Sequence, residues 1–91
     1  ALDQNFVLVT HAPPHDTLVD RTHDGMHVGS KSIRQFIEER QPIVALCGHI
    51  HEARNTDRLG RTLIVNPGSI GKGYAAEILV EDGVSARLLG P

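Results

Sequence analysis

Two histidines, His49 and His51, directly follow the apolar run of residues 43–47. A short apolar run bounded by polar residues is typical of a buried β-strand, which puts the pair at the end of that strand. Side chains two residues apart on a strand project from one face, and Gly48 would let the backbone turn sharply and bring both rings to one point. Imidazole is the commonest side-chain ligand for zinc, manganese, iron or nickel. The pattern therefore indicates a metal site, with two ordinary strand-end histidines as the alternative, because so short a motif recurs by chance.

A second apolar run, residues 6–10, also leads into a histidine, His11, and then into a loop that contains proline, histidine and aspartate. Proteins of the α/β class place their chemistry in such loops, at the carboxyl edge of the sheet. If the two runs lie side by side and parallel, His11 meets His49 and His51 at one edge.

The segment between the two runs supports that arrangement. Residues 31–40 have apolar side chains three and four apart, with Ser30 as a suitable N-cap and Pro42 just past the end, which predicts a helix. Strand, helix and strand make a βαβ unit with a right-handed crossover.

The loop before this helix, residues 16–29, has two glycines and few apolar residues, which predicts an irregular loop over the site. His23 and His27 stand four residues apart, as on one helical face, but Gly25 lies between them. We expect solvated loop histidines here rather than a second metal site, and His15 is expected to face either substrate or water.

Beyond Glu52 the pattern is that of antiparallel strands. Residues 53–59 are polar, Gly60-Arg61 predicts a turn, and residues 62–65 predict a strand. Residues 75–80 and 84–89 flank Glu81-Asp82-Gly83, and Asp-Gly between two apolar runs is a strong hairpin signal.

The loop of residues 68–73 contains three glycines together with Ser69 and Lys72. It could offer backbone N–H groups and an ammonium to a phosphate, and the alternative is a tight connection between strands.

Four motifs stand in a fixed order along the chain: Thr10-His11-Ala12-Pro13-Pro14, His27-Val28-Gly29-Ser30, Cys47-Gly48-His49-Ile50-His51-Glu52 and Asn66-Pro67-Gly68-Ser69. In order and spacing they resemble the second half of the calcineurin-like metallophosphoesterases, and most closely the small predicted phosphoesterases of archaea and bacteria. The resemblance covers about residues 6–89. It implies an α/β fold, half of a two-sheet α/β/β/α sandwich with a βαβ unit followed by antiparallel strands. It also implies hydrolysis of phosphomonoesters or phosphodiesters at a dinuclear metal centre.

Carried over by motif, the resemblance assigns His11 and His49 to one metal and His51 to the other. Glu52 is expected to orient one of these ligands without binding a metal ion itself. His27 lies near the active-site edge in the resembling proteins, which makes it a candidate substrate contact. Nitrogen and carboxylate ligands together favour manganese, iron, nickel or zinc over magnesium or calcium, so we expect two divalent transition-metal ions as cofactors.

The family's first half supplies Asp-x-His, Gly-Asp-x-x-Asp and Gly-Asn-His-Asp/Glu motifs, and none of them occurs here. The resemblance therefore makes residues 1–91 the carboxyl-terminal half of a single catalytic domain, with the missing amino-terminal half as its partner and little activity of its own. An alternative is a non-catalytic protein-interaction module on the same fold, as in the retromer subunit that resembles this family, although all three family histidines are present. A structural single-metal domain is disfavoured, because structural zinc sites are mostly rich in cysteine.

Composition narrows the remaining classes. The net charge is -2 and the Lys and Arg residues are scattered, so nucleic acid is not indicated as a partner. From these residues we expect no signal sequence, and no apolar run in them is long enough to cross a bilayer. The single cysteine, Cys47, excludes an internal disulfide, suits a reducing cytoplasm, and stands in an apolar run as a small buried hydrophobe rather than a ligand. We expect a cytoplasmic protein with a phosphate-ester substrate, and a homo-oligomer stays open.

Overall fold

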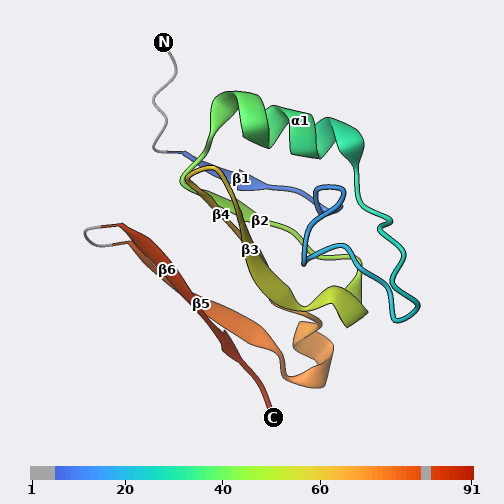
Figure 1. Cartoon of the computed structure of the whole chain (residues 1–91). Helices are drawn as coiled ribbons and strands as arrows, with labels where there is room; N and C mark the ends of the chain where they lie inside the picture. The colour runs from blue at the N-terminus through green and yellow to red at the C-terminus, as the bar shows by residue number, and fades with distance from the viewer. Residues whose placement is uncertain (1–5, 81–82) are drawn as a thin grey trace.

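A computed structural model describes residues 6–80 and 83–91, and Figure 1 shows their arrangement. Across these two ranges the fold is mixed α/β, with one α-helix, two short 3₁₀ helices and six strands in two sheets. In chain order the elements are β1 (Val7–Val9), α1 (Lys31–Arg40), β2 (Val44–Leu46), η1 (His51–Ala53), β3 (Asn55–Leu59), β4 (Thr62–Asn66), η2 (Ile70–Lys72), β5 (Ala75–Val80) and β6 (Val84–Leu89).

The first sheet has the strand order β1-β2-β4-β3. β1 and β2 are parallel, with Val7 opposite Val44 and Val9 opposite Leu46, so the predicted βαβ unit is confirmed. β4 is antiparallel to β3, as the sequence predicts, and also parallel to β2. Parallel pairing of β1 with β2 brings their carboxyl ends to the same edge.

Helix α1 has the predicted bounds. The hydroxyl of Ser30 caps its first turn by accepting a hydrogen bond from the backbone N–H of Ile33 at 3.1 Å. The helix ends at Gln41, which adopts the left-handed conformation with φ 49° and donates its backbone N–H to the carbonyl of Ile37. Pro42 follows, buried, and cannot continue the helix.

The core lies between α1 and the first sheet. Ile37 of the helix packs with Ala45 of β2 and Ile64 of β4, and Val19 from the preceding loop joins this cluster. Adjacent strand residues project to opposite faces, so Leu63 and Val65, which are also buried, project away from the helix. Figure 1 shows the β5–β6 hairpin on that side of the sheet.

The hairpin strands are confirmed with the predicted bounds, and their register runs from Ala75 opposite Leu89 to Val80 opposite Val84. Glu81 and Asp82 of the predicted turn lie outside the described residues. Helices in the described ranges are too short or too polar to cross a membrane.

Candidate metal centre

His11 and His49 come together at the carboxyl edge of the first sheet. His11 follows β1 and His49 follows β2, and the two segments stay paired beyond the strands because the Gly48 N–H donates to the His11 carbonyl at 3.2 Å. Nε2 of His11 lies 2.9 Å from Nδ1 of His49, and the ring centroids are 4.4 Å apart. Both side chains are exposed, so the pair is open to a ligand.

The sharp turn before His51 falls at His49, where the sequence suggested Gly48. Gly48 does not adopt a positive φ, whereas His49 has φ 64°. The reason is local: strand β2 ends at Leu46, and the Ile50 N–H donates back to the Gly48 carbonyl at 2.6 Å, which forces the residue between them into the turn. Non-glycine residues in this conformation are strained and are found preferentially at functional sites.

His51 does not join the His11–His49 pair. It opens the 3₁₀ helix η1 and lines a separate cavity of about 410 Å³. Within the described ranges no three His, Cys, Asp or Glu side chains are placed to hold one metal ion. The structure therefore does not bring the rings of His49 and His51 to one point, as the sequence suggested. The assignment of His51 to a second ion does not require the two rings to meet, so it stays a prediction.

Glu52 contacts the preceding loop. Its carboxylate accepts a hydrogen bond from the backbone N–H of His23 at 2.7 Å, which ties that loop to η1. No hydrogen bond joins Glu52 to His11, His49 or His51 in the described part of the chain, so its expected role in orienting a ligand stays a prediction.

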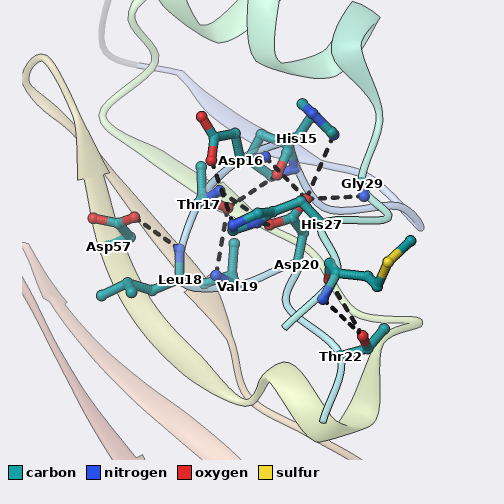
Figure 2. A network of polar contacts seen from close by, with 12 residues as sticks. His15, Asp16, Thr17, Leu18, Val19, Asp20, Thr22, His27, Gly29 and Asp57 are labelled. Atoms are coloured by element: carbon teal, nitrogen blue, oxygen red, sulfur yellow. Dashed lines mark hydrogen bonds and ion pairs between the residues drawn. The ribbon is translucent and has the colours of Figure 1, made fainter. Parts of the chain in front are cut away.

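Asp20 organises the loop between β1 and α1, as Figure 2 shows. Its carboxylate is fully buried and accepts hydrogen bonds from the backbone N–H groups of Asp16, Thr17 and Gly29, at 2.9, 3.0 and 2.9 Å. It also lies 2.6 Å from Nδ1 of His27. Burial raises the pKa of Asp20, but the contact with His27 and the three backbone N–H groups together outweigh burial and hold the pKa below its usual value.

The buried carboxylate fixes the ring of His27. Because Asp20 is ionised, Nδ1 of His27 is the donor, and Nε2 lies 3.4 Å from the exposed carboxylate of Asp16. The His27 side chain is 30% exposed, which leaves it accessible to a ligand, and its role as a substrate contact stays a prediction. His15 also approaches Asp20, with 3.8 Å between Nδ1 and the carboxylate.

Sequence reasoning missed Asp20, because an aspartate in a loop with few apolar residues is ordinarily solvated. Its neighbour Val19 is buried in the core, and an apolar pair at Leu18-Val19 is the one signal that this part of the loop turns inward. Cys47 is confirmed as buried: burial, with a smaller effect of Asp20, raises the pKa of its thiol to about 12, so it stays protonated and unreactive.

Three comparisons place this geometry among known proteins. The profile of a family described as metallophosphoesterase, calcineurin superfamily, matches residues 1–84. An uncharacterized protein of Methanocaldococcus jannaschii is 47% identical over 68 residues, which cover 70% of this chain and 31% of that protein. A solved crystal structure superposes with a TM-score of 0.77 at 26% identity, covering 99% of this chain and 34% of the other.

The chain spans about a third of the length of the proteins it matches. Since the family profile covers nearly all of the sequence, and the predicted motifs lie on the predicted elements, the chain belongs to the calcineurin superfamily of metallophosphoesterases.

Proposed function

We propose that the protein containing this chain hydrolyses phosphomonoesters or phosphodiesters at a dinuclear transition-metal centre. In this proposal His11 and His49 hold one ion and His51 the other. Membership of a metal-dependent hydrolase family supports the reaction class. The observation that carries the assignment is the 2.9 Å approach of ring nitrogens on His11 and His49, two exposed side chains that are 38 residues apart in sequence.

The donor chemistry of this pair fits a transition-metal ion. Imidazole nitrogens suit manganese, iron, nickel and zinc, and rings on two neighbouring strand ends are held more precisely than rings on a free loop. When bound, such ions supply Lewis-acid chemistry to a phosphoric ester. In this proposal the histidines of the centre hold the ions, and His27 contacts the substrate.

The centre is completed outside this chain. Asp20, Asp24 and Asp57 accept hydrogen bonds from other groups, so these carboxylates are not free to bridge two ions. We infer that residues 1–91 are the carboxyl-terminal half of one metallophosphoesterase domain and that the other half supplies the bridging carboxylate.

Metal content of the complete protein tests this proposal. Elemental analysis of the purified wild type should give two transition-metal ions per chain, and His11→Ala and His49→Ala should each lose one. His15→Ala is the matched control, because it removes a nearby loop imidazole that is not assigned to the centre. Unchanged stoichiometry in both variants would remove the pair from the metal site, and a metal-free wild type would favour a non-catalytic interaction module.

A further inference from the structure

A polar cavity of about 410 Å³ lies between η1 and η2, beside His51 and apart from the His11–His49 pair. Its lining side chains all carry nitrogen or oxygen atoms: His23, His51, Glu52, Ser69, Lys72 and Tyr74. A concave site with convergent polar groups is typical of ligand binding, and this volume exceeds what a water molecule or a small ion needs.

Lys72 is the cation of this cavity. Its ammonium forms no ion pair or hydrogen bond with any described residue, and its side chain is exposed. The acidic lining residue, Glu52, is already engaged by the His23 N–H at 2.7 Å. Because Lys72 forms no ion pair with Glu52 in the described structure, its positive charge is available to an anion that enters the cavity.

Hydrogen bonds and side-chain contacts hold the segment that carries Lys72 in place. The Ser69 carbonyl accepts hydrogen bonds from the N–H groups of Lys72 and Tyr74, both at 3.1 Å, which closes the turn tightly. Arg54 packs against this segment. Its guanidinium lies 4.5 Å from the centroid of the Tyr74 ring, and its Nε donates a hydrogen bond to the Pro67 carbonyl at 3.1 Å. A side chain at Gly68 would lie 2.8 Å from Cδ of Arg54, so the close approach depends on this glycine. The cavity is thus largely formed before a ligand binds, which lowers the entropic cost of binding.

The chemistry of the lining selects the ligand. The lining residues include an ammonium donor on Lys72 and hydroxyl donors on Ser69 and Tyr74, and a phosphate group offers the charge and the acceptor oxygens that such donors require. Because the cavity adjoins His51, an anion held there would sit next to the metal centre assigned above.

We propose that this cavity is a second anion subsite, in which Lys72 and Ser69 bind a non-reacting phosphate group of the substrate. The inference rests on the proposed function in one respect, since it takes the substrate to be a phosphoric ester. It narrows that substrate class to compounds with a second phosphate besides the one that is hydrolysed.

Binding to the metal-free complete protein tests the subsite without using activity. Calorimetric titration with pyrophosphate, after removal of metal with a chelator, should show binding by the wild type that Lys72→Met weakens about tenfold, the effect of losing one charge-assisted contact. Lys31→Met is the matched control, because it removes the same charge from the exposed start of α1 and should leave the affinity unchanged. Lys72→Arg should retain most of the binding.

The subsite would be overturned by a wild type that does not bind pyrophosphate, or by equal losses of affinity in Lys72→Met and Lys31→Met. A fall in melting temperature of Lys72→Met with unchanged affinity would also overturn it, since it would assign Lys72 to a contact with the rest of the protein. If the metal-loaded wild type hydrolyses neither p-nitrophenyl phosphate nor bis-p-nitrophenyl phosphate while Lys72→Met still loses pyrophosphate binding, the proposed function fails and the subsite stands. An inorganic phosphate titration then separates the two sources: comparable affinity for phosphate would mark a site for free phosphate, and overturn the assignment to a substrate group.

Discussion

His49 is held in a conformation that few side chains adopt, and its pairing with His11 depends on it. With φ 64° the residue lies in the left-handed region, which costs a residue other than glycine about 1 kcal/mol. His49 contacts His11 in this strained conformation, so placing the ring that we assign to the metal lowers the stability of the fold locally.

Substitutions at this position should separate backbone strain from ligation. His49→Gly and His49→Ala both remove the imidazole, so both should lose one metal ion. Glycine relieves the strain in the folded state, and this gain is partly offset because glycine also makes the unfolded chain more flexible. The free energy of unfolding of metal-free His49→Gly should therefore exceed that of metal-free His49→Ala by about 0.5 to 1 kcal/mol. Urea denaturation measures the difference, and a more stable alanine variant would show that the turn is not retained in solution.

Asp20 should make the stability of the protein depend on pH in the acid range. Its folded-state pKa lies below the usual value of 3.8, so its ionised form stabilises the fold fully above about pH 4. As pH falls through the lower folded-state pKa, that contribution is lost. Asp20→Asn should therefore flatten the acid limb of a plot of unfolding free energy against pH.

At neutral pH, Asp20→Asn should lower the free energy of unfolding by about 1 to 3 kcal/mol. The side-chain NH2 group of asparagine replaces an acceptor oxygen, so at least one buried N–H group loses its hydrogen-bond acceptor. Glu77→Gln is the control: it removes one carboxylate from an exposed pair with Arg87, at 3.0 Å, and such pairs contribute little. Equal effects of the two substitutions would contradict the role assigned to Asp20.

Among the elements, α1 connects β1 and β2, the two strands whose ends lead into His11 and His49. Its first turn is capped by the Ser30 hydroxyl, which accepts from Ile33 at 3.1 Å. Ser30→Ala should lower the free energy of unfolding by about 1 kcal/mol. Ser32→Ala is the control: Ser32 is exposed in the first turn of the helix and does not cap it, so this substitution should be nearly neutral. Thermal unfolding of both variants measures this, and a neutral Ser30→Ala would mean that the cap is not formed.

The regular elements could be predicted because their signals are local. Apolar residues three and four apart defined α1, and Asp-Gly between two apolar runs defined β5 and β6. The approach of His11 to His49 followed from a single further step, the parallel pairing of two strands that each end in histidine.

The rest of the site could not be predicted, since it depends on contacts that no local pattern encodes. The turn at His49 is fixed by the bond from Ile50 to Gly48, and the loop before α1 is fixed by the buried carboxylate of Asp20 and by Glu52, which is 29 residues from its partner His23.

On the scale of the whole molecule, β1 forms a free edge of the first sheet in the described part of the chain. Among the described strands β1 pairs only with β2, and it exposes Val7 at 49% and Val9 at 71%. A strand with a free edge and apolar side chains is a template for pairing with further chain. This is the surface against which we place the missing amino-terminal half.

Thiol labelling of the complete protein should detect that cover. Val9→Cys should resist maleimide until the protein is unfolded, whereas Ser32→Cys, exposed on α1, should react at once. The native thiol does not interfere, because Cys47 is 6% exposed and its pKa is raised to about 12. Rapid labelling at both positions would show that β1 remains an open edge.

The proposed division of the metal centre between two halves of the protein leads to a prediction about activity. Residues 1–91 contain the paired rings of His11 and His49, but among the described residues no carboxylate joins them in a group that could hold a metal ion, and none of the family's aspartate motifs is present in the sequence. Two ions held about 3.5 to 4 Å apart need a bridging ligand between them, so this chain alone should not hydrolyse bis-p-nitrophenyl phosphate faster than the free metal does. The complete protein with added manganese or nickel should do so. Release of nitrophenol can be followed for both proteins at equal metal concentration, and turnover by the chain alone would mean that three histidines suffice and that the division of the site is wrong.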